Sequence, residues 1–121
     1  MIKTIFGWLE RWRRSYRVEW VEDLPDSPRA RTVYVIGGRE HPFYAAVVCP
    51  RQKCGEVIHL EISEQFPNRW KLYEHENRTV SLHPSIHVTG RACRCHYWLR
   101  RGRIEWSESP PLFVPKTNKK A

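Results

Sequence analysis

The pattern of apolar and polar positions predicts a chain built mainly of short β-strands. Residues 17–22 read R-V-E-W-V-E and residues 56–62 read E-V-I-H-L-E-I, an alternation typical of strands with one buried face. Residues 43–48 form a nearly continuous apolar run, which indicates a central strand buried on both faces. Further short strands are predicted at residues 32–36, 69–73, 79–82, 97–99 and 103–106.

Turn residues separate these segments. Two prolines within residues 23–28 break the chain after the first strand, and Gly37-Gly38 ends the second. Arg100-Arg101-Gly102 is a hairpin signal, because glycine accepts the positive φ that a tight turn needs. Short strands punctuated in this way predict a mainly β domain over residues 17–107, a single small sandwich or half-barrel of antiparallel strands.

The two ends of the chain have a different character. In residues 1–16, apolar side chains recur at helical spacing with basic residues between them, which predicts an amphipathic basic helix. This helix either packs on the sheet or contacts a partner or a membrane surface, and it is not apolar enough to span a membrane. Residues 108–121 are polar and basic, so we expect a flexible tail.

Length and charge narrow the picture further. A chain of 121 residues forms one modest core, to which a metal site would add stability. The net charge of +8 favours acidic partners, although charge alone does not choose among nucleic acid, anionic lipid and acidic protein. No secretion signal is recognisable, so we expect a cytoplasmic protein whose cysteines are thiols or metal ligands.

The four cysteines form two pairs that are predicted to bind zinc. Cys49 and Cys54 flank a turn directly after the buried strand, and Cys93 and Cys95 precede another strand. Four thiolates in two pairs suit the tetrahedral, sulfur-rich site that zinc prefers. The spacing is not that of a standard finger, so buried thiols, a disulfide, and a ligand set with His96 in place of Cys95 stay open as alternatives.

The run H-P-S-I-H at residues 83–87 is the candidate for catalysis. Pro84 is expected to stiffen a turn and to hold Ser85 in a fixed position. A serine becomes a nucleophile only beside a base and donors that stabilise an oxyanion. His83, His87 and His96 are candidate bases, and the sequence does not show which of them meets Ser85.

Four segments together resemble a known family. They are R-V-E-W-V-E-D-L-P, C-P-R-Q-K-C-G, L-H-P-S-I and C-R-C-H-Y-W-L-R-R-G-R-I-E-W, and they fall within about residues 17–106. The chain resembles a family of small zinc-binding bacterial proteins, formerly a domain of unknown function, that is associated with prokaryotic ubiquitin-like conjugation operons. The resemblance implies a peptidase that trims or removes the ubiquitin-like protein, with that protein and its conjugation enzymes as partners.

The chain departs from the family pattern at two cysteines. The first turn often reads C-P-C-G-C-G and the later element C-x-S-H-F-W, whereas this chain lacks the middle cysteine and has Cys95 in place of serine. On this comparison His96 is left as the general base for Ser85, and backbone amides near Gly90 or Cys95 would form the oxyanion site. The structural zinc ion would be held by Cys49, Cys54, Cys93 and Cys95.

Three other functions compete with a serine peptidase. Metal-assisted hydrolysis needs an open coordination position and a carboxylate base, and a closed set of four cysteines argues against it. A non-catalytic zinc adaptor of the conjugation machinery would use the basic helix and Arg100, Arg101 and Arg103 as contacts. A nucleic-acid-binding zinc module is disfavoured because the basic residues are scattered and no aromatic ladder is evident.

Overall fold

The structure is a computed structural model that describes residues 14–51, 54–88, 94–107 and 116–118. Within these ranges the chain is almost entirely β, with one short 3-10 turn at Glu76–Arg78. The strands are β1 (Arg17–Val21), β2 (Thr32–Ile36), β3 (Tyr44–Val48), β4 (Val57–Glu61), β5 (Lys71–Glu74), β6 (Val80–His87), β7 (His96–Arg100), β8 (Arg103–Trp106) and β9 (Lys116–Asn118).

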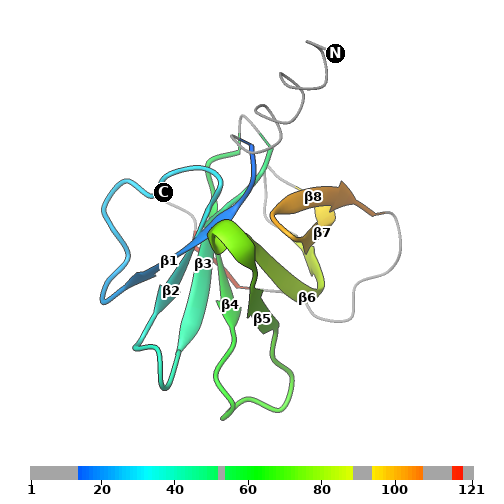
Figure 1. Cartoon of the computed structure of the whole chain (residues 1–121). Helices are drawn as coiled ribbons and strands as arrows, with labels where there is room; N and C mark the ends of the chain where they lie inside the picture. Colours follow the sequence, from blue (N-terminus) through cyan, green and yellow to red (C-terminus); the bar gives the residue numbers. More distant parts are fainter. Residues whose placement is uncertain (1–13, 52–53, 89–93, 108–115, 119–121) are drawn as a thin grey trace.

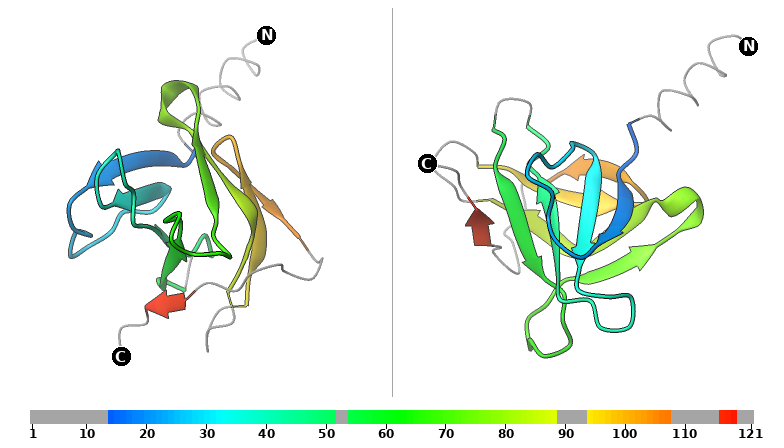
Figure 2. Two further views of the ribbon diagram at one scale, coloured as in Figure 1. Left: turned by 90° about the horizontal axis from the view of Figure 1, so that it is seen from below. Right: turned by 90° about the vertical axis from the view of Figure 1, so that its left-hand side faces the viewer.

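The strands form two sheets that lie on either side of a shared core (Figures 1 and 2). The first sheet has the order β1-β2-β3-β4-β9, and the second has the order β5-β6-β7-β8. Among the described residues the two sheets do not close into a barrel. The prediction of a mainly β domain is confirmed.

One pairing differs from the expected antiparallel arrangement. β1 and β2 run parallel, with Arg17 opposite Thr32 and Val21 opposite Ile36, while the other paired strands are antiparallel. Residues 22–31 carry the chain back along the edge of the sheet, so β2 begins at the same end as β1. The expectation of purely antiparallel strands is therefore wrong for β1.

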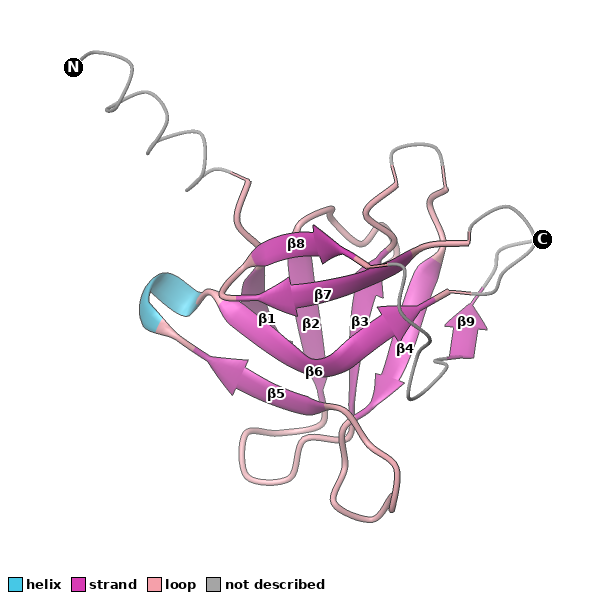
Figure 3. Cartoon of the chain, turned by 90° about the vertical axis from the view of Figure 1, so that its right-hand side faces the viewer, coloured by secondary structure: helices cyan, strands magenta, loops and turns pink. Residues whose placement is uncertain are grey.

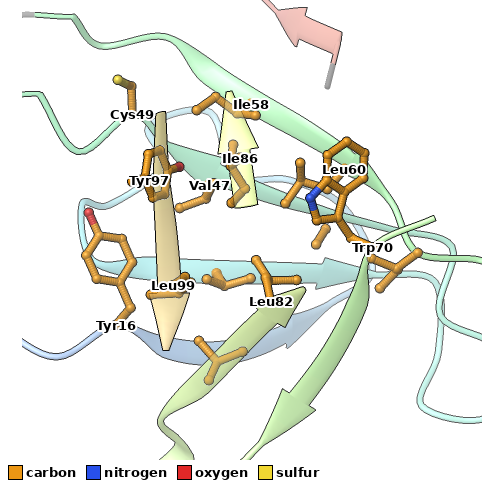
Figure 4. Close-up of a cluster of buried hydrophobic side chains, with 14 of the residues drawn as sticks. Tyr16, Val47, Cys49, Ile58, Leu60, Trp70, Leu82, Ile86, Tyr97 and Leu99 are labelled. Carbon is orange, nitrogen blue, oxygen red and sulfur yellow. The ribbon is translucent and has the colours of Figure 1, made fainter. Parts of the chain in front are cut away.

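The core is made by the inward positions of both sheets (Figure 4). β3 is the central strand predicted from its apolar run, since Ala45 and Val47 face this core and Ala46 lies in a second cluster on the other face of the sheet. Burial of these side chains stabilises the fold by about 25 cal/mol for each Å² of apolar surface removed from water. Large core residues from the second sheet are Leu82, Ile86, Tyr97 and Leu99.

The hairpin between β7 and β8 connects the second sheet to the first. Arg101 and Gly102 both have positive φ, 47° and 79°, as the predicted tight turn requires. Gly102 donates its N–H to the carbonyl of Val80 and accepts a hydrogen bond from the N–H of Tyr16, each at 2.8 Å. The predicted hairpin is confirmed, and it also anchors the residue that leads into β1.

The ends of the chain lie mostly outside the described residues. The helix predicted at residues 1–16 falls there except for its last positions, where Tyr16 is buried in the core. In residues 108–121, expected as a flexible tail, Lys116–Asn118 forms β9 and pairs with β4. Within the described ranges there is no helix with the length and apolar character needed to cross a membrane.

Candidate active site

β6 carries the candidate nucleophile through an irregularity in the sheet. The strand continues from Val80 to His87 through Pro84, so the turn expected around Pro84 is wrong. Leu82 is opposite Leu99 and Ile86 is opposite Tyr97, so the register shifts and extra residues of β6 bulge out of the ladder. Proline has no N–H to donate and is tolerated in a strand at such a bulge. Bulges of this kind re-aim side chains and are frequent beside active sites.

The bulge brings Ser85 against the histidine expected to be its base. Ser85 Oγ lies 2.7 Å from His96 Nε2, a hydrogen-bonding distance. His96 is the first residue of β7, and its Cα is paired with that of His87 on β6. Which histidine meets Ser85 is open in the sequence, and in the structure it is His96, on the strand next to β6.

The surroundings of His96 favour the neutral imidazole. Burial, followed by the charge of nearby His87, lowers the pKa of His96 below its usual value. The rings of His87 and His96 are tilted by 36° with their centroids 5.2 Å apart. A neutral imidazole that bears its proton on Nδ1 can accept the Ser85 proton at Nε2. The geometry therefore suits general-base chemistry.

The main chain of Ser85 is also held in place. Ser85 is 3% exposed, and its carbonyl oxygen accepts a hydrogen bond from the indole N–H of Trp70 at 3.4 Å. Trp70 is itself 4% exposed and belongs to the main core. The position of the nucleophile is therefore coupled to the packing of the core.

A second serine–histidine pair, which the sequence does not reveal, joins Ser81 on β6 to His75 in the turn after β5. His75 Nε2 is 2.6 Å from Ser81 Oγ, and the N–H of Arg101 donates to the same oxygen at 2.8 Å. Ser81 Oγ accepts that amide proton at the hairpin turn, which leaves its own proton for His75. The sequence signal, S81 six residues after H75, is too weak to reveal this contact because it depends on the intervening turn.

The cysteines are only partly covered by the described residues. Cys49 and Cys95 are buried, with their sulfur atoms 3.4 Å apart, and Cys54 packs against the same core. Cys93 and Gly90 lie outside the described residues. In the ranges that the structure does describe, no group of three histidine, cysteine, aspartate or glutamate side chains is arranged to hold a metal.

The described cysteine pair can be compared with what zinc requires. A sulfur–sulfur separation of 3.4 Å is far longer than a covalent disulfide bond of about 2.05 Å. Two thiolates on one tetrahedral zinc ion, each about 2.3 Å from the metal, lie about 3.8 Å apart. The Cys49–Cys95 pair therefore fits two corners of such a site without large movement.

The loop between β3 and β4 is closed by a tight turn and a main-chain hydrogen bond. Gly55 has a φ of 70°, so the chain turns tightly after Cys54. The N–H of Cys49 donates to the carbonyl of Glu56 at 2.8 Å, which closes the loop between β3 and β4. This loop brings the first cysteine pair toward Cys95 at the start of β7.

A hydrogen-bonded serine and histidine on adjacent strands of a small β-protein define a candidate hydrolase site. The family model described as "Bacterial ubiquitination-like system serine protease (BubE)" matches residues 20–107, and the chain belongs to this family. The matched segment includes Ser85, His96 and all four cysteines. No curated protein and no solved structure matches the chain.

Proposed function

We propose that this protein is a serine peptidase that processes the C-terminus of the ubiquitin-like protein of its bacterial system, or releases that protein from conjugates. Ser85 is the nucleophile and His96 is the general base. The observation that carries this proposal is the 2.7 Å contact between Ser85 Oγ and His96 Nε2 in a chain of a serine protease family. Membership of that family supports the reaction class, and the contact supports the assignment of the two residues.

The acylation step follows from this geometry. His96 Nε2 accepts the Ser85 proton while Oγ attacks the carbonyl carbon of the scissile bond, and a tetrahedral oxyanion forms. The protonated His96 then donates that proton to the leaving amine, the C–N bond breaks, and the acyl group stays on Ser85 as an ester. A base held in contact with the hydroxyl contributes typically 10²- to 10⁴-fold to such a rate.

Deacylation uses the same two residues. His96 accepts a proton from a water molecule, whose oxygen attacks the ester carbonyl, and the proton returns to Ser85 Oγ as the ester bond breaks. The products are the amine released in the first step and a new C-terminal carboxylate on the ubiquitin-like protein. The register of β6 and β7 keeps both side chains in place through the cycle.

We further propose that the four cysteines hold a structural zinc ion. The ligands would be Cys49, Cys54, Cys93 and Cys95, and the ion would supply a rigid cross-link between the loop after β3 and the start of β7. Support comes from the burial of Cys49 and Cys95, from the separation of their sulfur atoms, and from the donor chemistry. Because Cys95 directly precedes His96, this cross-link would also fix the base.

Ser85 is preferred over Ser81 because of the partners of the two hydroxyl groups. The Ser81 oxygen already accepts a main-chain N–H, which ties it to the hairpin turn and withdraws electron density from it. Ser85 pairs with His96, whose pKa is lowered by burial. The Ser81–His75 contact is accordingly assigned to joining β6 to the turn after β5, and the Arg101–Ser81 hydrogen bond to holding β6 against the hairpin.

The two serines provide a matched test of the function. The Ser85→Ala variant should lose cleavage of the ubiquitin-like precursor while it keeps the melting temperature of the parent protein. The Ser81→Ala variant should retain most of its activity. Undiminished cleavage by Ser85→Ala would refute the nucleophile assignment, and a stable complex with the precursor without any cleavage by the parent protein would favour the adaptor function.

A further inference from the structure

The candidate catalytic dyad, Ser85 and His96, faces the outer surface of the second sheet. Along β7, the buried residues Tyr97 and Leu99 alternate with His96, Trp98 and Arg100, so the latter three point away from the core. No strand or helix of the described ranges covers this surface, which is turned toward the viewer in Figure 3. A substrate that reaches the dyad must therefore lie against this face.

Beside the dyad, three side chains form a continuous row, here called the Trp98 row: His83, Trp98 and Arg100. The ring of His83 lies 5.7 Å from that of Trp98, and the guanidinium carbon of Arg100 lies 4.4 Å from the Trp98 ring centre. His83 is two residues before Ser85 on β6, and Trp98 is two residues after His96 on β7. The row thus begins where the dyad ends.

The charge of this face is positive. The strand register places Lys71 beside His83 and Arg103 beside Arg100, so both share the outer face with the row. Glu105 also lies there, opposite Trp98, and its carboxylate is 3.0 Å from Arg100 Nη1. Three cations against one carboxylate leave an excess of positive charge beside the candidate active site.

We propose that the Trp98 row is the subsite that holds an acidic, extended tail of the ubiquitin-like substrate. This inference rests on the proposed function, because the tail must reach Ser85. The flat ring of Trp98 packs against the backbone and aliphatic atoms of the tail, and Arg100 pairs with a carboxylate. Two observations favour this occupant: the row is continuous with Ser85 and His96, and its positive charge is complementary to an acidic tail.

The spacing along β7 predicts which position of the tail is read. Residues of a strand rise about 3.3 Å each, so the Cα atom of Trp98 lies about 7 Å and that of Arg100 about 13 Å along the strand from that of His96. The guanidinium of Arg100 reaches back over the Trp98 ring, 4.4 Å from its centre. An extended substrate has the same repeat. With its scissile carbonyl at Ser85, it places the second neighbouring residue over Trp98 and about the fourth residue beside the main chain of Arg100, with the guanidinium between them. The subsite therefore favours an acidic residue about two to four positions from the cleaved bond.

Binding to a non-cleaving protein tests this subsite separately from catalysis. In the Ser85→Ala background, the intact ubiquitin-like protein of the same system is titrated by calorimetry. Trp98→Ala should weaken binding about tenfold and Arg100→Gln about threefold to fivefold. Glu105→Gln, which removes the competing carboxylate, should strengthen binding about twofold. Melting temperatures of all variants establish that each is folded.

The first sheet offers a matched control. There the guanidinium carbon of Arg39 lies 5.1 Å from the ring centre of Trp20, the same kind of pair on a different part of the molecule. Arg39→Gln should leave the affinity unchanged. Equal affinity of the Trp98, Arg100 and Arg39 variants would overturn the subsite, even if Ser85 proves to be the nucleophile.

A series of peptides tests which residue type the subsite recognises and at which position. Glycine–alanine peptides that carry one aspartate about one to six positions from the scissile bond should bind best with the aspartate about two to four positions away. Replacement of that aspartate by asparagine should remove the preference. Added salt should lower the affinity for the aspartate peptide more than the affinity for the asparagine peptide, because the contact is between charges. A preference that is independent of both position and charge would contradict the proposal.

Discussion

The indole N–H of Trp70 points at the carbonyl oxygen of Ser85, 3.4 Å away, so a core residue supports the main chain of the candidate nucleophile. Trp70→Phe keeps most of the packing and removes the donor. The expected loss is about 1–2 kcal/mol of unfolding free energy, from an unsatisfied carbonyl and a small cavity. The free energy is measured by chemical denaturation.

In the Trp70→Phe variant the rate of cleavage should fall even under conditions where the loss of unfolding free energy leaves the protein folded. A displaced nucleophile loses its alignment with the substrate, and small displacements cost as much as 10²-fold in rate. We expect about a tenfold lower rate of precursor cleavage at a temperature where the variant is fully folded. Trp106→Phe is the control, because Trp106 is 54% exposed and should change neither quantity. Parent-like cleavage by Trp70→Phe would show that Ser85 does not need this support.

The hairpin glycine gives a second prediction. Gly102 has a φ of 79°, and a Cβ there would lie 3.0 Å from the carbonyl oxygen of Tyr16 and 3.3 Å from the Thr79 side chain. Gly102→Ala should therefore destabilise the fold by about 1–3 kcal/mol, since it strains the turn that links the two sheets. Gly38→Ala, with open space around its Cβ position, should stay within about 0.5 kcal/mol of the parent protein. Similar melting temperatures for both variants would contradict the role assigned to Gly102.

Metal removal gives a third prediction. If the four cysteines hold zinc, the purified protein contains one zinc ion per chain, and its binding contributes about 10–16 kcal/mol to folding. A strong chelator should abolish the cooperative thermal transition, and added zinc should restore it. Cys49→Ser should lower the zinc content and the melting temperature together. A zinc-free protein with a normal melting curve would eliminate the structural zinc ion.

The alternating and apolar patterns identified most strands because burial imposes these periods on the sequence. β2, β3 and β4 lie within a residue or so of their predicted bounds. For β6 the sequence predicts a strand only to residue 82, since proline cannot donate to a strand ladder, whereas in the structure β6 continues to His87 with Pro84 within the bulge. The parallel pairing of β1 also escaped prediction, since residues 22–31 look like any proline-rich turn.

The sequence indicated the residue types of the candidate site better than it indicated which histidine contacts which serine. By residue type alone, His83, His87 and His96 are equivalent candidates, and only the family resemblance singles out His96. In the structure the register of β6 against β7 brings His96 rather than His83 to the hydroxyl. His83 contacts Trp98 instead. The sequence does not reveal the Ser81–His75 pair, because the contact depends on a turn in which Asn77 and Arg78 both take positive φ values. Asparagine accepts this conformation readily, but arginine adopts it only rarely.

Covalent labelling tests the central claim most directly. A fluorophosphonate forms a phosphorus–oxygen bond with an activated serine as fluoride leaves, and mass spectrometry of the digested protein locates the adduct. We predict a single adduct on Ser85, unchanged in Ser81→Ala, and formed at least about 100-fold more slowly in His96→Gln because the base is absent. Labelling at Ser81, or labelling of Ser85 at the parent rate in His96→Gln, would contradict a Ser85–His96 catalytic pair.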